Sequence, residues 1–145
     1  MSFPASPAMG DTHIKDGKTW QYKGSDVWER VAADYEELTS NSNTTLDCSK
    51  FDSVRATWAI NANYTLTFDN VSTGQAGDVV IVVTGECEVT VAEGGTRTLN
   101  YADSETYSFV DDKITLAAGR YHLCFTAGSD WMDFNIQKYD REVTT

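Results

Sequence analysis

His122 and Cys124 come closest, in this 145-residue sequence, to the residue types and spacing of a reactive pair. Residues two apart in a β-strand share one face, where a histidine and a cysteine could bind a metal ion or act as base and nucleophile. Neither further metal ligands nor a third residue that would orient the histidine can be recognised around them. We therefore interpret the pair as part of a surface or an interface. No catalytic, cofactor-binding or metal-binding residue is assigned, and an enzyme is not expected.

Carboxylates gather at three places in the second half of the chain. They are Asp103 with Glu105, Asp111 with Asp112, and Asp130 with Asp133. Two carboxylates across a cleft could hydrolyse a glycosidic bond, and several carboxylate oxygens could bind Ca²⁺. Aspartate at a corner of the chain more commonly bonds to its own backbone, so we interpret these residues as turn formers. Ca²⁺ is kept as the alternative, and no other cofactor is predicted.

The four tryptophans offer aromatic surface for a ligand or for a protein partner. An indole combines a large apolar area with a hydrogen-bond donor, which suits a sugar and a protein interface equally well. Trp58 lies in an alternating apolar run and is predicted to belong to the core. Trp131 begins a strand beside an acidic turn, so it is the better candidate for an exposed tryptophan that faces a ligand. A protein interface is the favoured use of these aromatic residues.

A run of β-branched residues at 79–83 marks the centre of the fold. After Gly85 the pattern becomes an alternation in which Cys87, Val89 and Val91 share one face. The same period of two recurs along the chain, and each apolar face of this kind must be covered by a second sheet. The pattern predicts an all-β fold, with an antiparallel β-sandwich or jelly-roll-like main domain. Its strands are expected near residues 44–48, 53–61, 63–69, 78–84, 86–92, 96–101, 105–110, 113–117, 120–126 and 131–138.

The N-terminal region has a different pattern. Residues 1–11 carry both prolines and are expected to form an extended arm, in which Phe3 and Met9 could act as apolar anchors. Residues 12–32 contain a hairpin signal at Asp16-Gly17 and then a second turn, which predicts a small three-stranded β-meander. So short a meander cannot build its own core and must pack against the rest of the chain or a partner. The predicted organisation is an attachment region at 1–32, a linker at 33–43 and a β-sandwich domain at 44–145.

Composition narrows the classes of partner. Acidic residues number 22 against 11 lysines and arginines, which gives a net charge of −11. A field of this sign repels nucleic acid and anionic membranes, so neither is expected as a partner. The three cysteines are widely spaced and are expected to be free thiols. The first ten residues lack the basic segment and the continuous apolar run of a signal peptide, so synthesis in a cytoplasm is expected.

Two stretches resemble parts of bacteriophage proteins. The first is similar to the short N-terminal element of many tailed-bacteriophage structural proteins, especially fibres and appendages. It consists of Phe3-Pro-Ala-Ser-Pro7, Gly10-Asp11, Asp16-Gly17, Trp20-Gln-Tyr22 and Val27-Trp28-Glu-Arg30. The second resembles β-sandwich modules of phage fibre and virion decoration proteins. It consists of Leu46-Asp-Cys-Ser-Lys50, Ala62-Asn-Tyr-Thr-Leu-Thr-Phe-Asp-Asn70 and Gly74-Gln-Ala-Gly77, followed by the strand at 79–83.

The resemblance implies a non-enzymatic structural protein of a phage virion, assembled in the host cytoplasm. A capsid decoration or cement protein, or a short head fibre, fits the length, because no stalk or coiled coil is present; a homotrimer is expected. The N-terminal region would bind the major capsid protein or other virion proteins. The expected contact residues are Phe3, Pro4, Pro7, Trp20, Tyr22 and Trp28. The alternative is a tail appendage or tail-tip module that binds host surface carbohydrate, with Trp131 at its site.

Overall fold

The computed structural model describes residues 3–15, 18–30 and 35–139, and it is built almost entirely of strands. The prediction of an all-β fold is confirmed. The hairpin turn predicted at Asp16-Gly17 lies outside the described residues. The strands are β1 (Thr12–Lys15), β2 (Lys18–Gly24), β3 (Val27–Arg30), β4 (Glu36–Glu37), β5 (Thr44–Asp47), β6 (Val54–Ile60), β7 (Tyr64–Asp69), β8 (Ala76–Val83), β9 (Cys87–Glu93), β10 (Thr98–Tyr101), β11 (Lys113–Leu116), β12 (Gly119–Ala127) and β13 (Trp131–Tyr139), with one turn of 3₁₀ helix, η1 (Cys48–Lys50). No helix in the described part of the chain is long and apolar enough to cross a membrane.

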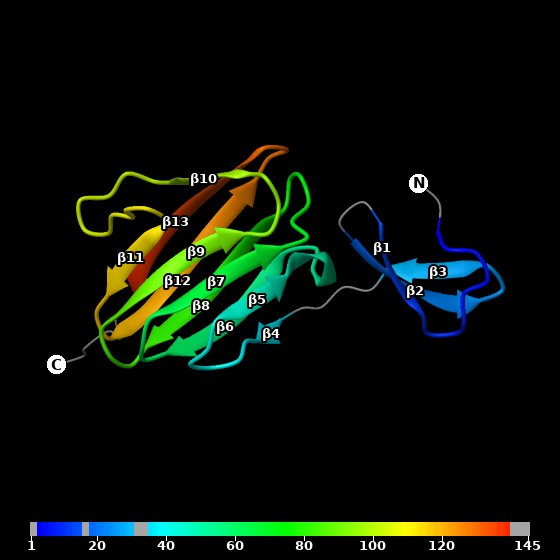
Figure 1. The fold of residues 1–145 in the computed structure, drawn as a ribbon, viewed down its shortest axis with the longest axis horizontal. Helices are drawn as coiled ribbons and strands as arrows, with labels where there is room; N and C mark the ends of the chain where they lie inside the picture. Colours follow the sequence, from blue (N-terminus) through cyan, green and yellow to red (C-terminus); the bar gives the residue numbers. More distant parts are fainter. Residues whose placement is uncertain (1–2, 16–17, 31–34, 140–145) are drawn as a thin grey trace.

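The first three strands form a small antiparallel sheet in the order β1-β2-β3 (Figure 1). The turn between β2 and β3 has Ser25 and Asp26 at φ angles of 51° and 58°. Positive φ at both central residues is the geometry that lets a two-residue turn follow the twist of a hairpin. The three strands expected in this segment are therefore present.

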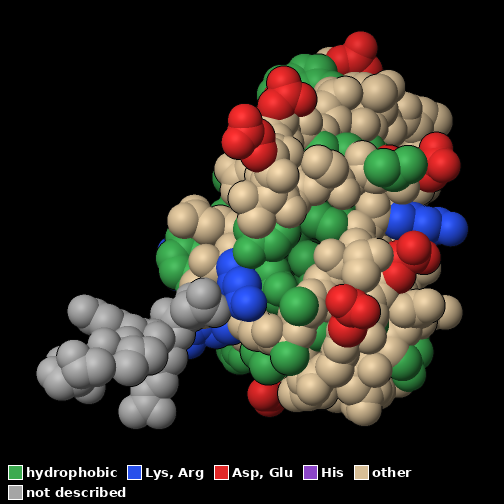
Figure 2. Space-filling view, turned by 90° about the vertical axis from the view of Figure 1, so that its left-hand side faces the viewer, with side chains coloured by type: hydrophobic (Ala, Val, Ile, Leu, Met, Phe, Trp, Pro, Cys, Tyr) green, Lys and Arg blue, Asp and Glu red, His purple; other side chains and the backbone are tan. Residues whose placement is uncertain are grey.

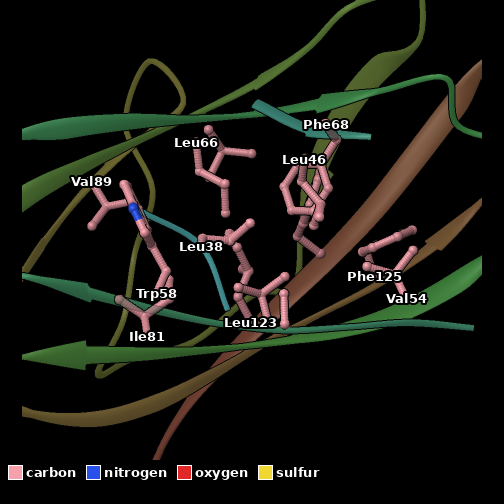
Figure 3. Packing of buried hydrophobic residues seen from close by; sticks show 14 of the residues in the cluster. Leu38, Leu46, Val54, Trp58, Leu66, Phe68, Ile81, Val89, Leu123 and Phe125 are labelled. Atoms are coloured by element: carbon pink, nitrogen blue, oxygen red, sulfur yellow. The ribbon is translucent and has the colours of Figure 1, made fainter. Parts of the chain in front are cut away.

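Two larger sheets face each other and enclose the main core (Figure 1). One has six strands in the order β10-β13-β12-β8-β6-β4, and the other has four in the order β11-β9-β7-β5. Figure 3 shows Trp58 and Ile81 of the first sheet directed toward Leu66 and Val89 of the second. Trp58 is completely buried, which confirms its predicted place in the core. Phe68 of β7 links the sheets, because its ring lies 5.1 Å from that of Phe125 and 5.5 Å from that of Phe134.

The strands of the main domain are not all antiparallel, so this part of the prediction is wrong. From β4 to β9, successive strands alternate between the two sheets, so that β4, β6 and β8 are parallel neighbours in one sheet. In the other sheet β5, β7 and β9 are also parallel. Antiparallel pairing joins β8 to β12, β12 to β13 and β9 to β11. Alternation in a sequence shows which face is buried and is the same for both strand directions; a jelly-roll connection is not confirmed.

The strand predicted at 105–110 is also wrong. Residues 102–109 form a loop that crosses from the six-stranded to the four-stranded sheet, and Val110 makes an isolated bridge to Lys113. The apolar alternation has another cause: Phe109 stacks on Tyr101 with ring centres 4.0 Å apart, and Tyr107 contacts Tyr121 edge to face. These rings cover the core from a segment that pairs with no neighbouring strand. A sequence pattern alone cannot distinguish such a segment from a strand.

Candidate functional site

Most of the residues predicted to contact a partner form one aromatic cluster on the N-terminal sheet. The cluster consists of Phe3, His13, Trp20, Tyr22 and Trp28. The ring of Phe3 stacks on Trp28 at 4.8 Å and meets Trp20 edge to face at 5.6 Å and His13 at 5.8 Å. Tyr22 lies 5.3 Å from Trp28. The register of the sheet explains this grouping, because His13 pairs with Trp20 and Tyr22 pairs with Trp28, so all four project to one side.

The described part of the expected arm, residues 3–11, folds back over its own sheet rather than extending away from it. The backbone amide of Gly10 donates to the carbonyl of Tyr22 at 3.0 Å, and that of Tyr22 donates to the carbonyl of Asp11 at 2.8 Å. Pro4 is exposed and Pro7 is half-buried. The extended arm is therefore not confirmed, and Phe3 serves as an anchor for its own chain.

The opposite face of the N-terminal sheet was not singled out by the sequence. It carries Ile14, which is 42% exposed, and Val27, which is 52% exposed; Met9 nearby in the chain is 72% exposed. Their signal in the sequence is the alternation within β1 and β3, which places Ile14 and Val27 opposite His13 and Trp28. These apolar side chains are exposed, whereas the rings of the aromatic cluster are half-buried.

A small polar junction joins the N-terminal sheet to the main domain. The hydroxyl groups of Thr19 and Ser49 lie 2.9 Å apart, and the Arg30 guanidinium forms an ion pair with Asp52 at 2.8 Å. Arg30 also donates to the carbonyl of Thr19 at 3.1 Å. Ser49 belongs to η1 and Asp52 follows it closely, so the N-terminal sheet contacts the main domain at this single helical turn. Figure 1 shows the two parts side by side with η1 facing the small sheet.

Two side chains hold η1 in place. Asp47 accepts hydrogen bonds from the Ser49 amide at 3.1 Å and the Ser49 hydroxyl at 2.6 Å, as an N-cap residue does. Buried Gln75 donates from Nε2 to the carbonyls of Cys48 and Phe51 at 2.8 and 3.1 Å. Gln75 comes from the Gly74-Gln-Ala-Gly77 loop, so this motif has a structural role in supporting the junction.

The hydrogen bonds of Asp47 at the start of η1 predict that the stability of the fold depends on pH. Burial alone would raise the pKa of Asp47, but the hydrogen bonds from Ser49 and Asn70 outweigh it and hold the pKa below its ordinary value. The stabilisation is complete above the pKa of about 4 of an unfolded aspartate, and it is lost as the pH falls through the lower pKa of the folded state. Asp47→Asn should therefore lower the melting temperature at about pH 7 but much less at about pH 3. An equal loss at both values would contradict this, and the measurement is thermal unfolding followed by circular dichroism.

His122 and Cys124 project from the outer face of the six-stranded sheet, where the partner of the histidine is Asp78. Nδ1 of His122 lies 2.8 and 3.0 Å from the two carboxylate oxygens of Asp78. The sequence alone could not identify Asp78 as the partner of His122, because the two residues are 44 positions apart and are brought together by the register of β8 against β12. Burial, and then the charge of Asp78 and a hydrogen bond to it, raise the pKa of the Cys124 thiol. The thiol therefore stays protonated beside the negative charge of Asp78, which is not the arrangement of an activated nucleophile.

The three thiols are free, as expected, and their places differ. Cys48 and Cys87 are buried, whereas Cys124 is only partly so. Burial raises the pKa of Cys48 to about 12. Within residues 3–15, 18–30 and 35–139, no group of three or more His, Cys, Asp or Glu side chains is placed to hold a metal ion.

The carboxylates have two roles. Asp111 and Asp112 form a tight turn at φ angles of 53° and 62°, and Asp112 accepts a hydrogen bond from the hydroxyl of Tyr101 at 2.8 Å. Burial and this contact raise the pKa of Tyr101. Asp103 and Asp133 instead line a groove on the outer face of the six-stranded sheet. The turn interpretation thus holds for Asp111 and Asp112, whereas Asp103 and Asp133, one from each of the other pairs, lie in the lining of one groove.

The groove has a volume of about 490 Å³ and lies across β10, β13 and β12. Its polar lining consists of Asn100, Asp103, Cys124, Thr126, Asp133 and Asn135. Trp131, predicted to face a ligand, projects from the same face of β13 and is 37% exposed. Its indole packs on Gly128, where an added Cβ would lie only 2.1 Å from the ring.

The end of the main domain that carries the 102–109 loop has a second hollow. Figure 2 shows apolar side chains in the middle of this end, with acidic and basic side chains around them. A hollow of about 500 Å³ is lined here by Tyr107, Val110 and Ile114, together with Glu88, Asp111 and Lys113. Nothing in its chemistry favours one class of ligand.

No protein-family model matches the sequence, and no curated protein matches it.

Proposed function

We propose that this chain is a non-enzymatic structural protein of a bacteriophage virion, a capsid decoration protein or short head fibre that attaches through its N-terminal region. The resemblance of residues 3–30 and 46–83 to phage structural proteins supports this. The observation that carries the proposal is the form of the N-terminal sheet: it packs its aromatic residues against each other and leaves Met9, Ile14 and Val27 exposed.

The energetics favour a partner for this sheet. Three short strands bury little apolar area, and a unit of this size is marginally stable in water. Burying an exposed apolar side chain of the size of valine or isoleucine contributes up to about 1.5–3 kcal/mol. Contact of Ile14, Val27 and Met9 with a virion protein would therefore stabilise the sheet and the assembly together.

Within this proposal, the two facing sheets form a β-sandwich that projects from the shell, and three chains assemble around a three-fold axis. The partner is the major capsid protein or another virion protein. The net charge of −11 argues against packaged nucleic acid as the partner.

A sedimentation assay with purified heads, tails and host cells of the source phage tests the proposal. The full-length protein should bind heads saturably. Ile14→Glu with Val27→Glu should weaken this binding at least tenfold, which corresponds to about 1.4 kcal/mol. Val110→Glu is the matched control, because Val110 is 69% exposed on the main domain, away from the proposed contact face.

Two results would contradict the proposal. Binding by the double variant at the affinity of the unaltered protein would show that this face is not the contact. Binding to tails or cells, with none to heads, would place the protein in the tail appendage class instead. Circular dichroism spectra of the variants show whether each is folded.

A further inference from the structure

We infer that the groove on the outer face of the six-stranded sheet is a binding site for a neutral saccharide. This site lies on the main domain and involves no residue of the proposed attachment region. The inference therefore stands or falls independently of a virion location.

The sheet register assembles the groove from residues far apart in the sequence. Directly paired residues project to the same side of a sheet, and Asp133 is paired with Asn100 on one neighbour and Thr126 on the other. Asn135 is paired in the same way with Cys124. The result is a patch of amide, hydroxyl and carboxylate groups at fixed spacing on three adjacent strands.

Hydrogen bonding within the groove orients its central acid. Nδ2 of Asn100 donates to Oδ1 of Asp133 at 3.0 Å. The second carboxylate oxygen of Asp133, the amide of Asn135 and the hydroxyl of Thr126 make no hydrogen bond among the described residues and can bond to a ligand. A sugar hydroxyl both donates and accepts, so it can donate to the carboxylate and accept from the amide. A rigid sheet holds these groups in place before the ligand arrives, which lowers the cost of binding.

Charge and size define the class of ligand. The lining contains two aspartates and neither lysine nor arginine, so phosphate, sulfate or carboxylate groups would be repelled. The volume of about 490 Å³ lies within the usual range for small-molecule sites. Trp131 lies outside the groove lining, two residues before Asp133 on the same face of β13, so its indole can contact the apolar face of a sugar ring that extends beyond the groove. A neutral, hydroxyl-rich ring satisfies all three conditions.

Two-dimensional amide NMR of the full-length protein tests this inference. The probes are methyl glycosides of glucose, galactose and mannose and also N-acetylglucosamine, each titrated with Ca²⁺ and again with EDTA. At least one neutral sugar should shift the amide signals of Asn100, Thr126 and Asn135 saturably, and EDTA should leave the affinity unchanged. Glucose 6-sulfate and glucuronic acid should bind at least tenfold more weakly than the neutral sugar.

Variants separate the groove from other surfaces. Asp133→Ala and Asn135→Ala should each lower the affinity for the neutral sugar about tenfold, as the loss of one well-placed hydrogen bond does. Trp131→Ala should also weaken binding. Glu86→Ala is the control, because Glu86 is an exposed acid outside the groove lining.

Three outcomes would overturn the inference. They are the absence of saturable shifts with every neutral sugar, shifts that map to a different surface, and binding that disappears in EDTA. The last would replace direct recognition by a site in which a cation bridges the ligand. Because none of these measurements uses phage particles, they leave the attachment proposal untouched.

Discussion

Replacing Trp58 by alanine is expected to lower the free energy of unfolding by about 3–5 kcal/mol, the usual cost of removing a large aromatic side chain from a core. Trp58 is completely buried in β6 and extends from the six-stranded sheet toward Val89 of the other sheet (Figure 3). Its removal would leave a cavity between two sheets that are each held by their own ladders, so neither can collapse to fill it.

Trp58→Phe should be far less harmful, although it also removes volume. The indole Nε1 of Trp58 is buried and has no hydrogen-bond partner among the described residues. An unpaired buried donor costs about 1–3 kcal/mol, and phenylalanine removes that donor while keeping most of the apolar area. The two effects oppose each other, so we expect a loss below about 1.5 kcal/mol.

Urea unfolding followed by far-ultraviolet circular dichroism measures both variants. Val110→Ala serves as the control, since a 69% exposed side chain should change stability by less than about 0.5 kcal/mol. A Phe variant as unstable as the Ala variant would show that the indole donor finds a partner in solution.

The second large effect is expected for Gln75→Ala, which should lower the free energy of unfolding by about 2–5 kcal/mol. The side chain of Gln75 is 6% exposed and serves three backbone groups: the carbonyls of Cys48 and Phe51, and the amide of Ser72, which donates to Oε1 at 3.1 Å. Alanine would leave buried polar groups without their partner, at about 1–3 kcal/mol each. The Cys48 carbonyl would still accept a hydrogen bond from the amide of Phe51 at 3.2 Å, so the total loss of stability is smaller than three such penalties.

Gln75→Glu distinguishes hydrogen bonding from packing. Glutamate has nearly the same shape but would direct a carboxylate oxygen at two carbonyl oxygens, so it should be at least as destabilising as alanine. Gln137→Ala is the matched control, because Gln137 is exposed on β13 and should change stability by less than about 0.5 kcal/mol.

The Gln75 variants also test the junction. Amide hydrogen exchange should show faster exchange in η1 and in β2 of Gln75→Ala, because η1 carries the Ser49 hydroxyl that contacts Thr19. Unchanged exchange at β2 would show that the N-terminal sheet is held independently of η1.

Local patterns predicted the elements of this fold and failed to predict their partners. The expected strands at 63–69 and 86–92 agree closely with β7 and β9, because side-chain alternation and turn residues are local properties. The parallel pairing of these two strands depends on which sheet each connection enters, which no local pattern records. The same reason explains the error at 105–110, where Tyr107 and Phe109 cover the core from a loop.

The candidate sites divide in the same way. The sequence identified Trp131 as accessible because it begins a strand beside an acidic turn. It assigned the His122 and Cys124 pair to a surface because no further ligand or orienting residue could be recognised around them. It could not identify Asp78 as the partner of His122, or Asn100 as the partner of Asp133, because each contact depends on strand register. The sequence also predicted partner contacts on the aromatic side of the N-terminal sheet, where the rings pack against each other and are half-buried, since tryptophan is as suited to a small core as to an interface.

The alternation of β4 to β9 between two sheets has a consequence for the order of folding. No two consecutive strands in this half of the domain are neighbours in a sheet, so none of its ladders can begin as a hairpin. Among the described strands of the main domain, only β12 and β13, which are antiparallel and joined by a short turn, can pair early. Between the two strands of each parallel pair, the chain passes through a strand of the opposite sheet. Pairing them therefore closes a longer loop, and such non-local contacts slow folding. We therefore expect the chain to fold from its C-terminal hairpin toward β4, with the parallel strands added in pairs, one to each sheet.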